Sequence, residues 1–142
     1  MVVEDNPVTQ DFCKLILKNA GYITEAAFSA QECLPKAKAF SPDVILMDVI
    51  LPDGDGKEVA RQLQSDPQTK GIPVIFVTNM ISARDDKGYE TFEIDGRIYR
   101  AFAKPVHGPK LLSVIRKEYN MHRYGGQPTP KLKVHGKDNH PA

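Results

Sequence analysis

The sequence contains no tryptophan and only two cysteines, Cys13 and Cys33, in 142 residues. The two cysteines lack metal-ligand spacing, and both fall in segments with a helical pattern. A single disulfide between them stays open, but we expect buried, reduced thiols in a cytoplasmic protein. A signal peptide and a run of about 18 apolar residues are also missing, so we expect no insertion into a membrane.

The chain also lacks a strong excess of charge of either sign. It has 19 basic and 18 acidic residues, a formal net charge of +1. This balance argues neither for nor against nucleic acid, and because no DNA-binding segment is visible, we expect no direct nucleic acid partner. The length suggests one domain, large enough to bury about two-thirds of its unfolded surface.

Apolar strand patterns alternate with helical patterns, which predicts a parallel sheet covered by helices on both faces. The predicted strands are 1–3, 23–28, 43–47, 73–77 and 98–103, and the predicted helices are 7–20, 29–40, 55–65, 82–92 and 108–121. Asn6 and Ser29 are suitable N-cap residues for the first two helices. The segment 82–92 has the weakest helical pattern because it is polar and contains Gly88.

The composition changes after Tyr124. Residues 125–142 contain three prolines, several lysines and histidines, and few large apolar groups. We interpret 1–124 as the folded domain and 125–142 as a disordered tail or the start of a linker.

Three carboxylates follow the first and third predicted strands. Asp48 ends the apolar run 44–47, and Glu4 and Asp5 follow strand 1–3. Open α/β sheets bind ligands beyond the carboxyl ends of their strands. If the two strands are neighbours, the carboxylates converge there, and two unit charges about 4 Å apart repel by roughly 4 kcal/mol at an effective dielectric near 20. The cluster therefore indicates a bound cation, raised pKa values, or both.

These carboxylates, together with motifs further along the chain, resemble the receiver domain of bacterial two-component response regulators. The resemblance covers Met1 to about Tyr124 and rests on the order and spacing of Glu4-Asp5, Met47-Asp48 with Pro52 and Gly56, Val77-Thr78, and Lys104-Pro105. It implies a flavodoxin-like, doubly wound (βα)5 three-layer fold with parallel strand order 2-1-3-4-5. That order would place the first and third strands side by side.

The resemblance also implies a chemistry for the site. Asp48 would take a phosphoryl group from a phosphohistidine, and Thr78 and Lys104 would bind phosphoryl oxygens. Mg²⁺ would be held by Glu4, Asp5, Asp48 and the backbone carbonyl of Ile50. Hard oxygen ligands of this kind are what Mg²⁺ prefers.

The implied partners are proteins. The phosphoryl donor would be a histidine kinase or a histidine phosphotransfer protein, and the downstream target is open. Output would go through the face formed by the fourth helix, the fifth strand and the fifth helix, which could also form a homodimer.

Two further functions stay open beside this one. Ala101 stands where the family usually has an aromatic residue, with Tyr99 two residues earlier on the same strand face, so a docking module that is not phosphorylated is the alternative. A Mg²⁺-dependent phosphatase with an aspartate nucleophile would need a second aspartate at position 50, where the chain has Ile50. We therefore expect a phosphoacceptor and not an enzyme.

Overall fold

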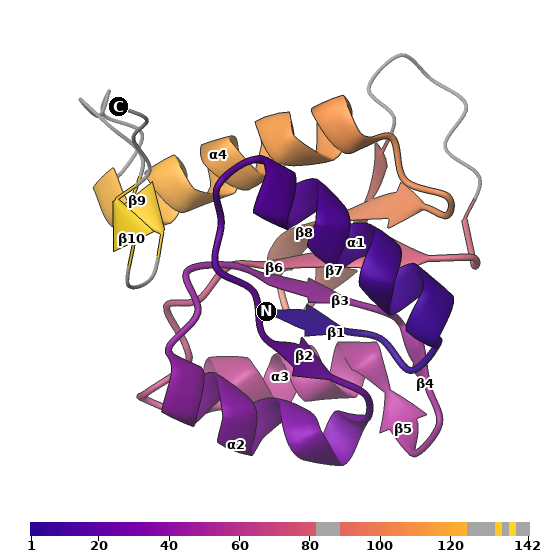
Figure 1. The fold of residues 1–142 in the computed structure, drawn as a ribbon. Helices are drawn as coiled ribbons and strands as arrows, with labels where there is room; N and C mark the ends of the chain where they lie inside the picture. Colours follow the sequence, from indigo (N-terminus) through magenta and orange to yellow (C-terminus); the bar gives the residue numbers. More distant parts are fainter. Residues whose placement is uncertain (82–88, 125–132, 135–136, 139–142) are drawn as a thin grey trace.

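The computed structural model describes residues 1–81, 89–124, 133–134 and 137–138. Its central sheet runs β2 (Ala26–Ala27), β1 (Val2–Val3), β3 (Ile45–Met47), β6 (Val74–Thr78), β8 (Arg97–Ala103) and β7 (Tyr89–Ile94). The first five strands are parallel, and β7 pairs antiparallel with β8 at one edge (Figure 1). The predicted order 2-1-3-4-5 of the parallel strands is confirmed, with one added strand.

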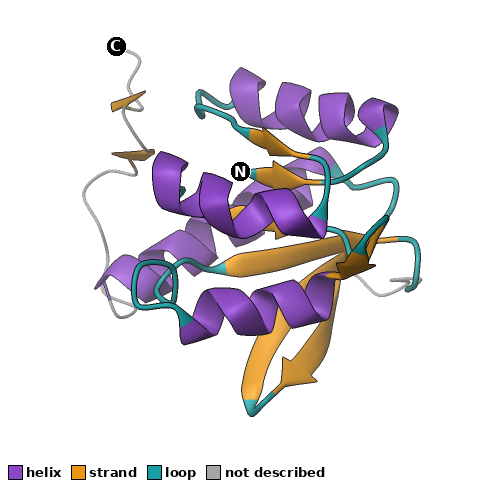
Figure 2. Cartoon of the chain, turned by 90° about the horizontal axis from the view of Figure 1, so that it is seen from below, coloured by secondary structure: helices purple, strands orange, loops and turns teal. Residues whose placement is uncertain are grey.

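In the described part of the chain, four helices cover the two faces of this sheet (Figures 1 and 2). They are α1 (Pro7–Asn19), α2 (Ala30–Phe40), α3 (Gly56–Ser65) and α4 (Gly108–Tyr124). One apolar core contains side chains of α1 and α4, such as Leu17 and Leu111, and the other contains side chains of α2 and α3, such as Ala37 and Leu63. The structure is thus the expected flavodoxin-like three-layer α/β fold.

The helices begin where the sequence indicated. The Asn6 side chain accepts hydrogen bonds from the backbone N–H groups of Val8 and Thr9, and the Ser29 hydroxyl accepts from the N–H of Glu32. These bonds satisfy backbone donors that a helix leaves unpaired at its start. A short hairpin of β4 (Ile50–Leu51) and β5 (Gly54–Asp55) leads into α3.

The prediction of a helix over 82–92 is wrong for residues 89–92, which belong to β7; residues 82–88 lie outside the described part of the chain. The turn that joins β7 to β8 is Asp95-Gly96, with φ angles of 52° and 82°. Two successive residues with positive φ form the two-residue turn that matches the twist of a β-hairpin. Paired aromatic residues, including Phe92 opposite Tyr99, then favour strand over helix.

Other predictions concern the cysteines, the membrane and the tail. Both cysteines are free and buried, and burial raises the pKa of Cys13 to about 11 and of Cys33 to about 12. None of the described helices has the length and apolarity needed to cross a membrane. Within the predicted tail, β9 (Lys133–Val134) pairs antiparallel with β10 (Lys137–Asp138), and the boundary at 124 stays a prediction.

Candidate functional site

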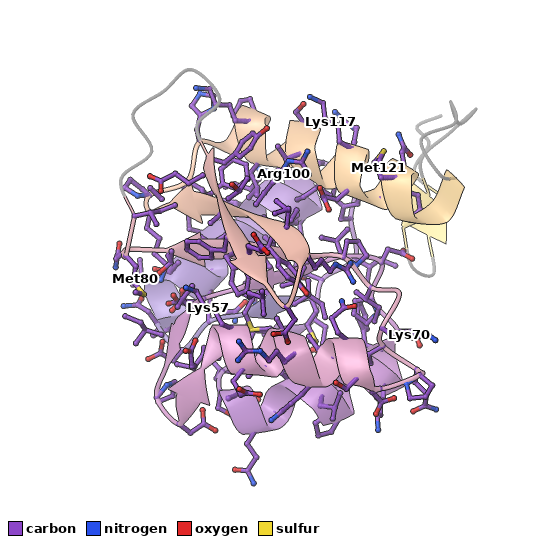
Figure 3. The ribbon with its side chains drawn as sticks, turned by 180° about the vertical axis from the view of Figure 1, so that it is seen from behind. Lys57, Lys70, Met80, Arg100, Lys117 and Met121 are labelled. Atoms are coloured by element: carbon purple, nitrogen blue, oxygen red, sulfur yellow. The ribbon has the colours of Figure 1, made fainter. Side chains whose placement is uncertain are left out.

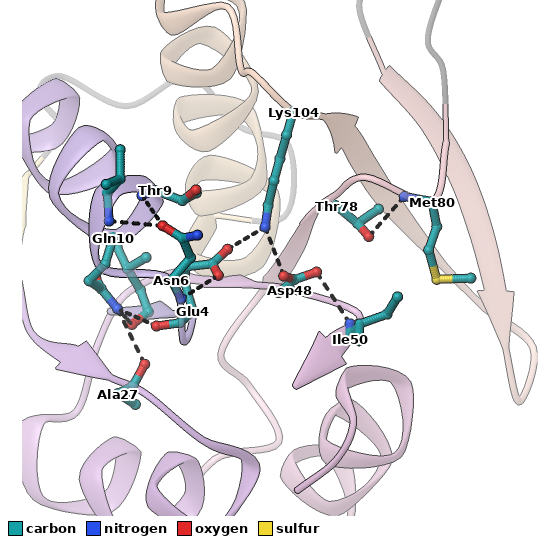
Figure 4. A network of polar contacts seen from close by, with 12 residues as sticks. Glu4, Asn6, Thr9, Gln10, Ala27, Asp48, Ile50, Thr78, Met80 and Lys104 are labelled. Atoms are coloured by element: carbon teal, nitrogen blue, oxygen red, sulfur yellow. Dashed lines mark hydrogen bonds and ion pairs between the residues drawn. The ribbon is translucent and has the colours of Figure 1, made fainter. Parts of the chain in front are cut away.

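The polar residues of the site lie at the carboxyl ends of four adjacent parallel strands (Figure 4). Glu4 follows β1, Asp48 follows β3, Thr78 ends β6 and Lys104 follows β8. The register pairs Val3 with Met47, so Glu4 and Asp48 are neighbours in space. The expectation that the first and third strands bring these carboxylates together is confirmed.

Lys104 links the two buried carboxylates. Its Nζ lies 2.8 Å from Oδ2 of Asp48 and 2.5 Å from Oε1 of Glu4. The remaining carboxylate oxygens are also bound, because Glu4 Oε2 accepts from the N–H of Asn6 and Asp48 Oδ1 accepts from the N–H of Ile50. Each carboxylate therefore has one charged and one backbone donor, which is the strongest kind of hydrogen bonding available to it.

Burial and neighbouring charges shift the pKa values of Glu4 and Lys104 in opposite directions. Burial raises the pKa of Glu4 above its ordinary value of 4.5, although the hydrogen bond from Lys104 opposes the shift. Burial lowers the pKa of the Lys104 ammonium, but its hydrogen bonds to Asp48 and Glu4 outweigh burial and raise that pKa above 10.5. The site consequently favours an additional positive charge and a protonated lysine.

Three carboxylates could hold a metal ion. Oxygen atoms of Glu4, Asp5 and Asp48 all lie within 4.8 Å of one another, with Asp5 exposed and the other two buried. All-oxygen ligands that leave room for water fit Mg²⁺ better than softer metals. Ile50 lines the same cleft, and the role of its backbone carbonyl stays a prediction.

Thr78 is fully buried and belongs to the lining of this cleft. Its hydroxyl oxygen accepts a hydrogen bond from the N–H of Met80 at 3.2 Å, which leaves the hydroxyl proton available for donation. The backbone carbonyl of Thr78 accepts from the N–H of Lys104, so the two predicted phosphoryl-binding residues are joined at adjacent strand ends. The cleft holds about 320 Å³ and includes Asp48, Thr78 and Lys104 in its lining.

Gln10 is a buried positioning residue that sequence reasoning missed. Its Nε2 donates to the carbonyls of Val2, Glu4 and Ala27, and thereby joins α1 to β1, to the residue that follows β1 and to β2 (Figure 4). A glutamine one turn from Cys13, on the face that packs on the sheet, was the available signal, because a buried amide needs backbone partners.

The missing aromatic residue at position 101 changes the packing beside the site. Ala101 lies opposite Phe76 and is fully buried. Tyr99 and Phe92 each place their rings 5.6 Å from the ring of Phe76. Phe76, the residue opposite Ala101, thus contacts aromatic residues from further down β8 and from β7.

Comparison with known proteins shows the class to which this fold and site belong. The family model for the response regulator receiver domain matches residues 1–116. The chain therefore belongs to the response regulator receiver domain family of two-component signalling.

Several relatives illustrate the match. The polar-differentiation response regulator DivK of Brucella ovis is 32% identical over 116 residues, which is 82% of this chain and 91% of DivK. A CheY-like receiver protein from Methanospirillum hungatei superposes with a TM-score of 0.69 at 25% identity, covering 88% of this chain and 95% of that one. The receiver domain of sensor histidine kinase PA1611 from Pseudomonas aeruginosa gives a TM-score of 0.70 at 24% identity, covering 84% and 94%, and has a magnesium ion in its active site cleft.

Proposed function

We propose that this domain accepts a phosphoryl group on Asp48 from the phosphohistidine of a histidine kinase or histidine phosphotransfer protein in the cytoplasm. One carboxylate oxygen of Asp48 forms the new bond to phosphorus, while the bond between phosphorus and the histidine nitrogen breaks and the imidazole leaves with the electron pair. The supporting observation is the contact of Lys104 Nζ with both Asp48 and Glu4.

Bound Mg²⁺ would neutralise charge on the phosphoryl group. Glu4, Asp5 and Asp48 provide the oxygen ligands, and the PA1611 receiver holds magnesium in its own active site cleft. Phosphoryl transfer asks a protein mainly for positioning and electrostatic stabilisation. In this chain the fixed strand ends would supply the positioning, and the charged groups would supply the electrostatic stabilisation.

Lys104 and Thr78 would then bind the phosphoryl oxygens. Lys104 would exchange a carboxylate partner for a phosphoryl oxygen, to which its ammonium bonds as a point charge. Thr78 would donate its hydroxyl proton to a second oxygen. Both side chains already face the cleft that contains Asp48, so binding the phosphoryl group requires no rearrangement of the sheet.

We place the output at the face that β7, β8 and α4 form. The sequence predicted a helix on this face, but residues 89–92 belong to strand β7, so the face presents a strand there. Phosphorylation would shift the population of conformations at this face when Asp48 and Thr78 gain new bonds.

The proposal is tested by intact-protein mass after incubation with acetyl phosphate and Mg²⁺. Wild type should gain one phosphoryl group, and Asp48→Asn should gain none. Asp53→Asn is the matched control, because Asp53 is exposed and, among the described residues, its carboxylate accepts hydrogen bonds from the backbone N–H groups of Ala30 and Gln31 at the start of α2. An adduct on Asp48→Asn would contradict the assignment of the acceptor, and the absence of both an adduct and Mg²⁺ binding would indicate a docking module.

The aspartyl phosphate should hydrolyse slowly. Ile50 lines the cleft, and Met80 lies two residues beyond Thr78, to whose hydroxyl its N–H donates. Their apolar side chains are 61% and 56% exposed, so neither can orient an attacking water by a hydrogen bond. Combining Ile50→Asn with Met80→Glu should speed loss of the phosphoryl group about tenfold, because oriented water and a general base lower the barrier. The decay of the phosphorylated mass over time measures this rate.

A matched control uses apolar residues of similar exposure away from the cleft. Ile98 is 61% exposed and Met121 is 59% exposed, so Ile98→Asn combined with Met121→Glu makes the same chemical change elsewhere. This control should leave the decay unchanged. Equal decay rates in wild type and in the Ile50/Met80 variant would contradict the prediction that apolar side chains protect the phosphoryl group.

A further inference from the structure

The edge strand β7 presents backbone hydrogen-bonding groups outward. The two-residue turn at Asp95-Gly96 makes Ile94 and Arg97 a hydrogen-bonded pair, because a β-turn joins the carbonyl of its first residue to the N–H of its fourth. Hydrogen-bonded and non-bonded pairs alternate from there. Thr91 and Glu93 therefore direct their N–H and C=O groups away from β8.

Within the described part of the chain, the outer side of β7 lacks several of the usual protections of a sheet edge. β7 is six residues long, keeps an unbroken register with β8, and contains neither proline nor lysine. No described strand pairs with its outer side, and the hairpin faces the viewer in Figure 3. Natural proteins usually block such edges with bulges, prolines, lysines or covering segments, because an open edge can pair with another strand.

We propose that two copies of this chain form a dimer in which β7 pairs antiparallel with β7 of the second copy, with the twofold axis at Phe92. The proposal does not rest on phosphorylation of Asp48. In this register Thr91 lies opposite Glu93 of the second copy, so the outward backbone groups of both residues bond to each other. The two central sheets would become one continuous sheet.

In this register the side chains of β7 in one copy are compatible with the side chains of β7 that they meet in the second copy. The two Phe92 rings face each other on one side of the sheet, and cross-strand aromatic pairs are favourable. Glu93 lies opposite the uncharged Thr91, and Glu90 lies opposite Ile94, so no two glutamates are directly paired. A shift of the axis to Glu93 would place two like charges opposite each other, which destabilises a strand pair.

One basic residue near β7, Lys57, complements Glu90 of a second copy. Lys57 places its Nζ 4.2 Å from the centre of the Phe92 ring, and Glu90 of the second copy would reach this ring diagonally across the strand pair. Neither Lys57 nor Glu90 has an ion-pair partner within the part of the chain that the structure describes. A second copy would bring these opposite charges together at both ends of the symmetric contact.

Thr91→Pro tests the dimer without disturbing the hairpin. The N–H of Thr91 points away from β8, and proline is tolerated at an edge position whose N–H faces outward. The change removes two intermolecular hydrogen bonds per dimer, one from each copy, and should weaken association at least about tenfold. Sedimentation equilibrium of the full chain measures this constant, and Thr91→Val, which keeps the N–H, should retain the dimer.

Cysteine cross-linking tests the register. Thr91→Cys and Glu93→Cys should form a disulfide-linked dimer when the two variants are mixed and oxidised, because residues opposite each other lie within disulfide range. Either variant alone should cross-link much less, since neither residue lies opposite itself. The buried native cysteines Cys13 and Cys33 should not react. A monomeric wild type at high micromolar concentration, or cross-linking of one variant alone as strong as of the mixture, would overturn the proposal.

Discussion

Replacing Gly56 with alanine is expected to destabilise the domain by about 3 kcal/mol or more, the upper part of the range for overpacking a tight site. A Cβ at Gly56 would lie 2.0 Å from the backbone oxygen of Asp48 and 3.0 Å from Cα of Val49. Backbone atoms cannot move aside as a flexible side chain would. The N–H of Gly56 also donates to the carbonyl of Val49 at 2.6 Å, so the start of α3 is held against the phosphoacceptor segment.

Urea unfolding followed by far-UV circular dichroism measures this loss, with Gly71→Ala as the matched control. A Cβ at Gly71 would meet nothing within 4 Å, so this variant should match wild type within about 0.5 kcal/mol. If Gly56→Ala unfolds at the same urea concentration as Gly71→Ala, the close approach of α3 to Asp48 is wrong. A folded but weakened Gly56→Ala should also accept phosphoryl groups more slowly, because the repositioned backbone belongs to Asp48.

The sequence predicted the parallel sheet and the central residues of the site because both depend on strong local patterns. Apolar runs ended by Glu4, Asp48 and Thr78 mark strand ends, and parallel strands collect their ends at one edge. Asn6 and Ser29 marked helix starts through side-chain bonds that act within a few residues. These features need no knowledge of distant contacts.

The β7–β8 hairpin was missed because its polar strand has the weaker pattern. Glu90, Thr91 and Glu93 are exposed, and an edge strand with one solvated side lacks the continuous apolar run of a buried strand. The Asp95-Gly96 dipeptide was the available signal, since it favours a two-residue hairpin turn. Phe92 and Tyr99 both pack against Phe76, the residue opposite Ala101, and the long-range contact of Phe92 could not be read from the sequence.

Within the site, the role of Gln10 also depends on long-range contacts that the sequence does not reveal. Its three backbone acceptors come from two strands and the segment after β1, so its role exists only once α1 has docked on the sheet. The sequence places a polar residue in an apolar helix face, but it does not say which carbonyls that residue will meet. Residues that touch the reacting group were therefore easier to predict than residues that hold the scaffold in place.

Lys104→Met is expected to destabilise the Mg²⁺-free domain by about 3 kcal/mol at neutral pH, because removing one partner from a buried ion pair leaves uncompensated charge. The side chains of Lys104, Glu4 and Asp48 are only 11%, 4% and 8% exposed. Without the ammonium, two buried carboxylates face each other. Urea unfolding in the presence of a chelator measures the difference, and Lys70→Met, an exposed lysine with no ion pair in the described structure, should show almost none.

The loss in Lys104→Met should depend on pH and on Mg²⁺ in a defined direction. Burial already raises the pKa of Glu4 above 4.5, and the hydrogen bond from Lys104 is the main effect that opposes it, so the variant should raise this pKa further. A raised folded-state pKa gives a stability contribution that is fully present below the unfolded value and is lost as pH rises through the folded value. The difference in unfolding free energy between wild type and variant should therefore shrink as pH falls toward 4.5.

Added Mg²⁺ at neutral pH should stabilise Lys104→Met more than wild type, since the ion would replace the missing positive charge. A gap that is constant with pH and unaffected by Mg²⁺ would show that Lys104 stabilises the fold by packing alone.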